Sequence, residues 1–134
     1  MAEQAFDARD VFVAFVENKF AGYLTICWTS TYPPFREATI PEIADFNVLP
    51  QFRRQGIGTA LMDKAESEIA KTSPIAGIGV GMDSDYGAAQ QLYVLRGYVP
   101  DGRGLHHKDR QIHYGEEVIV DDSLALYLIK KLRW

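Results

Sequence analysis

EIADFNVLPQFRRQGIG, residues 42–58, is the stretch that decides the fold of this chain. Its first part, Glu42–Leu49, alternates apolar and polar residues imperfectly, which predicts a strand that ends at Pro50. Apolar residues then recur at helical spacing in ALMDKAESEIAKT, residues 60–72, with charged residues between them. The sequence therefore predicts a strand that passes through an arginine and glycine loop directly into a helix.

The start of this helix has the residues that bind an anion. Backbone amides at a helix start have no intrahelical partner, and the helix dipole makes that end attractive to negative charge. Gly56 and Gly58 lack the Cβ atoms that would keep a phosphate away from those amides. Arg53 and Arg54 can add charge-assisted hydrogen bonds. We expect a pyrophosphate to bind here.

Two other kinds of phosphate-binding loop do not fit. A Walker-type loop needs a lysine followed by Ser or Thr after the second glycine, and Gly58 is followed by Thr59-Ala60. The dinucleotide-binding pattern needs a third glycine, and an acidic residue about 20 positions on after a further strand. Neither pattern is present.

The remaining segments predict one α/β domain over residues 1–134 with a mixed sheet. Asp83 and its neighbours are typical N-terminal capping residues, and Gly97 is typical of a helix end. The expected elements up to residue 82 are hairpin strands over 11–16 and 23–28, a proline-rich loop over 29–41 and a strand over 75–82 buried on both faces. After them we expect a helix from about 87 to 96, a short strand from 98, a loop or an irregular hairpin over 101–117 and a last strand over 124–129.

Composition excludes several classes of protein. A chain of 134 residues with 47% hydrophobic residues is sufficient for one globular core. A net charge of -4 disfavours a nucleic-acid partner. The single cysteine, Cys27, lies in an apolar run and is expected to be a small buried hydrophobe in a reducing compartment. No segment has the ~20 apolar residues of a membrane span or the apolar core of a signal peptide, so we expect a soluble cytoplasmic protein.

Two motifs carry a resemblance to a known family. NVLPQFRRQGIGTALM, residues 47–62, resembles the signature of the GNAT acetyltransferase superfamily, and GAAQQLYVLRGY, residues 87–98, resembles the later motif of that family. The motifs occur in the family's order, with a strand-like run between them, and the resemblance covers roughly residues 11–130. It implies an α/β fold with a mixed, mostly antiparallel sheet flanked by helices.

The resemblance also implies acetyl-CoA as co-substrate. The pantetheine arm is expected along the backbone of Phe46, Asn47 and Val48, where the strand splays from residues 75–82 and the thioester lies in the resulting V. Tyr86 stands near the pantetheine, where the family often carries an asparagine. The residues expected at the pyrophosphate are Arg53, Arg54, Gln55, Gly56, Ile57, Gly58 and Thr59.

The reaction implied is direct attack on the thioester by a primary amine of a small molecule or a peptide. An amine with a pKa near ~10 must lose a proton, and the departing thiolate is helped by a proton donor. Tyr93 matches the family tyrosine that donates that proton, although it could also be a core aromatic residue with a hydrogen-bonded hydroxyl. Glu42 stands where the histone acetyltransferase branch has its base, although it could be an ordinary strand-end carboxylate. Asp45 would point to the opposite face in a regular strand.

No metal site is expected. The three histidines, at positions 106, 107 and 113, lack carboxylate or cysteine company, so they are interpreted as polar loop residues near the acceptor pocket. Asp121 and Asp122 are interpreted as a turn before the last strand.

The chain departs from the family pattern at its front. Family members usually begin with a strand and two helices, for which only about ten residues stand before the first strand here. Either this part is truncated, or a partner covers the edge of the first strand, which is compatible with a homodimer. Two rival interpretations stay open: a non-catalytic module that senses acyl-CoA or binds a protein, and a transferase for a longer or charged acyl group.

Overall fold

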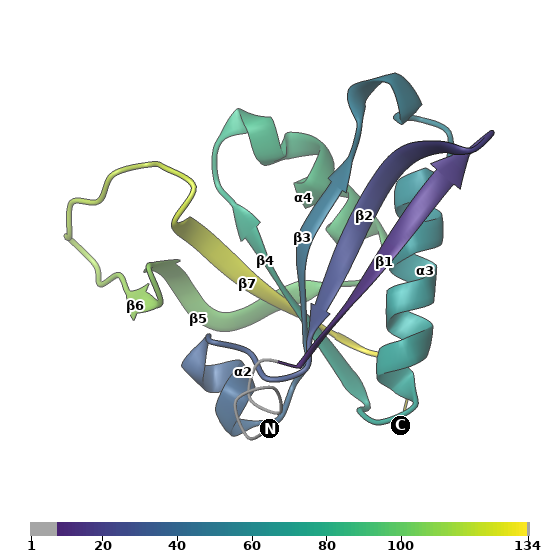
Figure 1. Cartoon of the computed structure of the whole chain (residues 1–134). Helices are drawn as coiled ribbons and strands as arrows, with labels where there is room; N and C mark the ends of the chain where they lie inside the picture. Colours follow the sequence, from purple (N-terminus) through teal and green to yellow (C-terminus); the bar gives the residue numbers. More distant parts are fainter. Residues whose placement is uncertain (1–7, 134) are drawn as a thin grey trace.

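The fold is a seven-stranded sheet in the strand order β1-β2-β3-β4-β7-β5-β6 (Figure 1). The structure is a computed structural model, which describes residues 8–133. Strands β3 and β4 pair in parallel and the other recorded pairs are antiparallel, which confirms the mixed, mostly antiparallel sheet. The elements are β1 (Arg9–Val16), β2 (Lys19–Cys27), α2 (Pro33–Glu37), β3 (Glu42–Val48), η1 (Pro50–Phe52), α3 (Ile57–Ala70), β4 (Ile75–Gly81), η2 (Ser84–Tyr86), α4 (Gly87–Leu95), β5 (Val99–His107), β6 (Arg110–Gln111) and β7 (Leu124–Lys131).

The expected hairpin is formed by β1 and β2. Val16 pairs with Lys19, so the connection is the two residues Glu17 and Asn18. Both have positive φ, 51° and 67°. A two-residue turn of this kind has the twist that matches two antiparallel strands, and asparagine tolerates it better than most residues.

The proline-rich segment contains a helix that the sequence interpretation did not predict. Residues 29–41 were expected to form a loop, but Pro33–Glu37 is the short helix α2, with proline in its first turn. Proline fits there because a first-turn N–H has no intrahelical partner and the fixed φ of proline is already helical. The helix buries Phe35, whose side chain is 1% exposed. The segment therefore covers part of the sheet.

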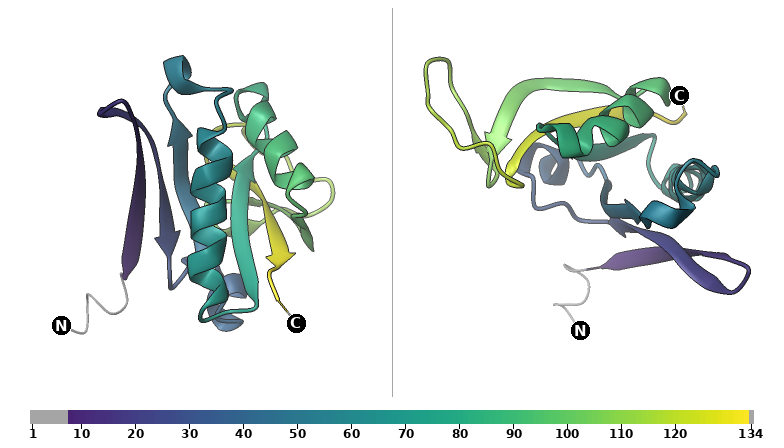
Figure 2. Two further views of the ribbon diagram at one scale, coloured as in Figure 1. Left: turned by 90° about the vertical axis from the view of Figure 1, so that its right-hand side faces the viewer. Right: turned by 90° about the horizontal axis from the view of Figure 1, so that it is seen from above.

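Helices α3 and α4 lie on the other face of the sheet from α2 (Figure 2). Strand β4 contacts the helices on both faces of the sheet, since successive side chains of a strand point to opposite faces. Ala76, Ile78 and Val80 of β4 join the core beneath α3, which confirms that this strand is buried. The core residues from α3 and α4 are Leu61, Met62, Ala65, Ile69 and Tyr93.

The alternate positions of β4 are glycines that receive aromatic rings. A Cβ atom built at Gly77, Gly79 or Gly81 would lie 2.3, 2.8 or 2.3 Å from the nearest ring atom. Real Cβ atoms do not approach other atoms this closely, so only glycine fits under these rings. The rings belong, in that order, to Phe35, Tyr127 and Tyr86.

The region after α4 differs from the sequence interpretation at His106 and His107, which both lie in strand β5 and not in a loop. Gly97 ends the helix with a φ of 98°, as expected. Asp83 accepts a hydrogen bond from the Asp85 amide and so caps η2, just before α4. His106, interpreted as a polar loop residue, is 5% exposed and meets the Tyr32 ring edge-on at a centroid distance of 4.9 Å. The interpretation was wrong because the segment before it joins the sheet as β5 and turns this ring inward.

Two further expectations can be compared only with the described residues, 8–133. Among the helices of this part, none has the length and apolar character needed to cross a membrane. The expected shortening of the front of the fold concerns about ten residues, of which residues 1–7 lie outside the described residues.

A matched pair of glycine substitutions tests the aromatic packing. We expect Gly77→Ala to destabilise the fold by about 1–3 kcal/mol, because the Phe35 ring is enclosed by Tyr32 and Tyr127 at centroid distances of 4.8 and 5.6 Å and cannot retreat freely. Gly87→Ala should instead stabilise by up to about 1 kcal/mol, since its Cβ meets nothing within 4 Å and its backbone is helical. Urea unfolding measures both, and equal effects would contradict this packing.

Candidate functional site

The site begins where β3 and β4 part. They pair only at Glu42 with Gly77 and at Ile43 with Ile78. Beyond these two positions the strands diverge, toward the top of Figure 1. From residue 44 to residue 48, β3 keeps β2 as its partner on one edge and has no strand partner among residues 8–133 on the other. Backbone N–H and C=O groups on that open edge can bind an extended ligand, as a further strand would.

A bulge in β3 redirects its side chains within this gap. Asp45 has a φ of 50°, and Ala44 and Asn47 pair with Thr25 and Tyr23, so β3 has one extra residue. Asp45 was expected to point away from Glu42 if β3 were regular. Because of the bulge, β3 is not regular at this position. Ile43 belongs to the core beneath α3, and because of the extra residue Phe46 packs on this same side. Asp45 itself is exposed and lies 3.9 Å from Arg9.

The start of α3, where an anion was expected to bind, has no side-chain cap on its first turn. Gly56 precedes the helix with a φ of 80° and a ψ of 7°. The first intrahelical bond runs from the Ala60 amide to the Gly56 carbonyl at 3.0 Å, so the amides of residues 57–59 have no intrahelical acceptor. A Cβ at Gly56 would meet nothing within 4 Å, so open space lies beside these amides. A phosphate group fits this arrangement.

The other residues expected at the pyrophosphate (the phosphate cradle) differ in their surroundings. Gly58 faces the core, since its Cβ would lie 3.2 Å from Phe46 and 3.8 Å from Val48. Arg53 donates from Nε to the Val48 carbonyl at 2.9 Å, which fixes the end of β3 beside the helix. Gln55 donates to the Gln51 carbonyl at 3.3 Å. The other positions, Arg54, Gly56 and Thr59, are exposed.

Tyr93 of α4 lies beside β3. Its side chain is 5% exposed, and its ring centroid is 6.4 Å from that of Phe46. No hydrogen-bond partner of the Tyr93 hydroxyl is recorded within residues 8–133, yet every fully buried polar side-chain atom there has one. This hydroxyl is therefore in contact with solvent at the end of a buried ring. Burial raises the pKa of Tyr93 well above its ordinary value, so the hydroxyl carries its proton at neutral pH.

Glu42 lies on the opposite face of the sheet, because Ile43 beside it points into the core. Its Oε1 accepts a hydrogen bond of 2.5 Å from the Ser30 hydroxyl. Burial raises the pKa of Glu42, the Ser30 hydrogen bond partly offsets this rise, and the charge of Asp109 adds to it. Glu42 is thus a half-buried carboxyl group whose surroundings disfavour its charged form.

An aromatic cluster next to Glu42 was only partly predictable. The rings of Tyr32 and Tyr127 stack at a centroid distance of 3.7 Å. The Tyr32 hydroxyl donates to Asp101 at 2.6 Å and the Tyr127 hydroxyl to Asp109 at 3.2 Å. Residues 29–41 were predicted as a proline-rich loop, and nothing in the sequence marked Ser30 or Tyr127. Long-range contacts bring these two residues to Glu42 and to the Tyr32 ring.

Tyr86, which was expected near the pantetheine, contacts Asp122 and Gly81. The Tyr86 hydroxyl donates to Asp122 at 2.9 Å, and its ring covers Gly81 at the open end of β4. Asp121 lies 2.9 Å from Nε2 of His107 and accepts from the Ser123 amide, which supports the interpretation of a turn. Within the described chain, no group of three or more His, Cys, Asp or Glu side chains could hold a metal ion.

Relatives share parts of this chain. A curated relative is an uncharacterized N-acetyltransferase from Archaeoglobus fulgidus, 34% identical over 76 residues that cover 56% of this chain and 51% of that protein. The chain thus spans about half the length of the curated relative it matches.

Solved structures share the fold at low identity. A nourseothricin acetyltransferase superposes with a TM-score of 0.68 at 21% identity, covering 92% of this chain and 65% of that one. YncA from Salmonella typhimurium, solved with its cofactor acetyl-CoA, superposes with a TM-score of 0.65 at 15% identity, covering 99% and 70%. A ribosomal-protein-alanine N-acetyltransferase from Brucella melitensis has a TM-score of 0.64 at 20% identity, covering 97% and 73%.

The family comparison agrees with the two sequence motifs. The family model described as "Acetyltransferase (GNAT) family" matches residues 2–98. This range includes the strand, the arginine and glycine loop, α3 and the helix that carries Tyr93. The chain belongs to the GNAT acetyltransferase family.

Proposed function

We propose that this chain is an N-acetyltransferase that moves the acetyl group of acetyl-CoA to a primary amine of a small molecule or a peptide. The observation that carries the proposal is the open edge of β3, which leads directly to the uncapped start of α3. An extended arm and a pyrophosphate are joined in the same order in coenzyme A. Family membership and the acetyl-CoA in YncA support this choice of co-substrate.

The open edge of β3 and the start of α3 would bind different parts of acetyl-CoA. Acetyl-CoA supplies an acetyl group activated as a thioester. Backbone groups over residues 44–48 would hold the pantetheine arm as an added strand, and Phe46 lines the arm from the α3 side. The amides of residues 57–59 would hold the pyrophosphate together with Arg54, whose side chain is exposed. Binding at both ends fixes the position of the thioester between β3 and β4.

Tyr93 and Glu42 would handle the two protons of the reaction from opposite faces of the sheet. The Tyr93 hydroxyl is protonated and not engaged by another side chain, so it can donate to the departing thiolate. Glu42 has a raised pKa, which makes it a stronger base than an exposed carboxylate once ionised. It would accept a proton from the amine, directly or through water, while Ser30 orients the carboxylate.

Turnover with acetyl-CoA on a panel of primary amines tests the function. We expect release of free CoA thiol in proportion to acetylated amine, and a decrease in kcat of about tenfold to a thousandfold for Tyr93→Phe. The affinity for acetyl-CoA should be nearly unchanged, because phenylalanine keeps the ring between Phe46 and Tyr98. Binding of acetyl-CoA without turnover on any amine would favour the non-catalytic interpretation, and an unaltered kcat with chemistry rate-limiting would exclude Tyr93 as the acid.

Glu42→Gln should have opposite effects on stability and on rate. Because the folded state raises the pKa of Glu42, its stabilising contribution is present below the unfolded pKa of about 4.3 and is lost as pH rises through the folded pKa. The variant should therefore be more stable than the parent at pH 7 and equal to it near pH 4. Its kcat/KM should be lower and should lose the rise with pH that ionisation of Glu42 produces. A variant less stable at pH 7 would contradict the desolvation of this carboxyl group.

A further inference from the structure

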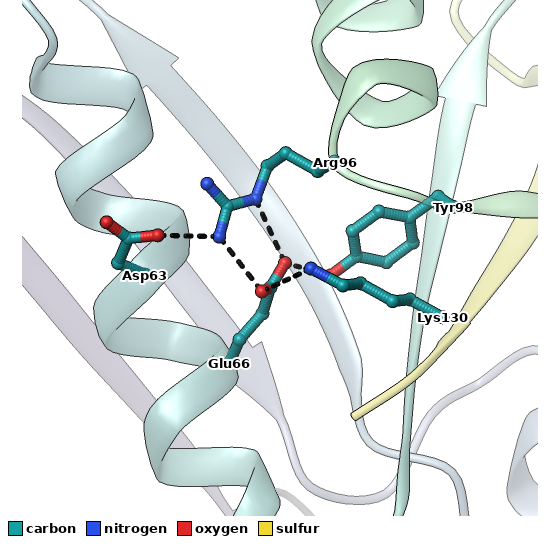
Figure 3. Close-up of polar contacts among 5 residues, drawn as sticks. All are labelled: Asp63, Glu66, Arg96, Tyr98 and Lys130. Carbon is teal, nitrogen blue, oxygen red and sulfur yellow. Dashed lines mark hydrogen bonds and ion pairs between the residues drawn. The ribbon is translucent and has the colours of Figure 1, made fainter. Parts of the chain in front are cut away.

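A buried carboxylate on α3 joins this helix to the turn between α4 and β5 and to strand β7 (Figure 3). Glu66 is 9% exposed and accepts four hydrogen bonds. Arg96 donates two of them, from Nε at 3.0 Å and from Nη2 at 2.9 Å. The Tyr98 hydroxyl donates at 2.9 Å and Lys130 Nζ at 2.8 Å. We name this set, with Asp63, which also contacts Arg96 at 2.8 Å, the Glu66 cluster.

The neighbours of the Glu66 carboxyl group hold it in its charged form. Burial alone would raise the pKa of Glu66, but the hydrogen bonds from Arg96, Lys130 and Tyr98 outweigh it and lower the pKa. The side chains of Arg96 and Lys130 are 12% and 23% exposed, so both cations are largely removed from water. Loss of the carboxylate would remove the acceptor that these two cations share, which is costly for charges that are largely removed from water.

The cluster holds the turn that follows the helix of Tyr93. Arg96 and Tyr98 flank Gly97, where the chain leaves α4 and enters β5. The Tyr98 amide donates to the Tyr93 carbonyl at 3.0 Å, and the two rings lie with their centroids 6.0 Å apart. Phe46 of β3 lies on Tyr93 as well, at 6.4 Å. The position of the Tyr93 ring therefore depends on Tyr98, and that of the Tyr98 hydroxyl depends on Glu66.

We propose that Glu66 is a positioning residue for Tyr93. Glu66 lies on the same helix whose start forms the phosphate cradle, so it fixes the tyrosine relative to the element that holds the co-substrate. This proposal rests on the proposed function, because it assigns Tyr93 a place at the thioester. It also goes beyond that function, because it assigns control over the position of the proton donor to a residue that touches neither acetyl-CoA nor the amine.

Fluorine NMR tests the positioning without turnover. The protein is labelled with 3-fluorotyrosine, and the Tyr93 resonance is identified by its loss in Tyr93→Phe. We expect Glu66→Gln to shift or broaden this resonance in the acetyl-CoA-free protein. The matched control is Glu68→Gln, two residues further along α3, which removes a carboxylate that is 24% exposed and contacts Lys64 and Lys71. The control should leave the Tyr93 resonance in place.

A Tyr93 resonance that is the same in Glu66→Gln and in the parent would overturn the proposal, whatever the activity. If Glu66→Gln fails to fold, Tyr98→Phe removes one of the four donors and keeps the ring. It should move the Tyr93 resonance in the same way, to a smaller extent, and an unmoved resonance in this variant would equally overturn the proposal. Absence of turnover in the parent protein would count against the proposed function alone.

A kinetic double-mutant cycle tests the consequence. Glu66→Gln should lower kcat by about tenfold or more in the parent and by less than about twofold in the Tyr93→Phe background, with little change in KM for acetyl-CoA. A purely structural role would lower the rate by the same factor in both backgrounds. That additive result would contradict an action of Glu66 through Tyr93.

Discussion

The separation of β3 from β4 after two paired residues is the constraint on which the rest of the structure depends. Unpaired backbone groups inside a sheet are costly, and a protein keeps them only where another group completes the ladder. The neighbouring features keep the gap open: the bulge at Asp45 turns Phe46 toward α3, and the Arg53 side chain holds the last carbonyl of β3. The gap leads to a helix start with uncapped amides, so one continuous surface offers hydrogen bonds to an extended, phosphorylated molecule.

Two carboxylates on opposite faces of this sheet illustrate how local surroundings assign different tasks to the same residue type. Glu42 has a single hydroxyl donor and no recorded ion pair in residues 8–133, so burial raises the pKa of its carboxyl group. Glu66 accepts hydrogen bonds from an arginine, a lysine and a tyrosine, and these bonds lower its pKa despite burial. The raised pKa of the first group suits it to accept a proton, and the lowered pKa of the second suits it to remain charged and hold its neighbours.

The sequence was informative where function depends on local backbone geometry. The strand, the two-glycine loop and the helix of residues 42–70 follow from residue types in order, and so does the hairpin. The second strand of the hairpin begins at Lys19 and not at residue 23, so its turn is shorter than expected. Features made by contacts distant in sequence could not be predicted. The hydrogen bond from Ser30 to Glu42, the burial of His106 and the four donors around Glu66 each join residues from separate elements. The helix α2 was missed because proline disfavours helix interiors but fits the first turn.

Amide hydrogen exchange with and without acetyl-CoA tests the central claim most directly, because it reads the backbone groups themselves. We predict that saturating acetyl-CoA slows exchange at those amides of residues 44–48 that do not bond to β2 and at the amides of residues 57–59, while β1 and its pairing with β2 exchange as before. Slowed exchange at both segments would show that the parted strand and the helix start bind one molecule. Binding of acetyl-CoA that left both segments unchanged would contradict the account.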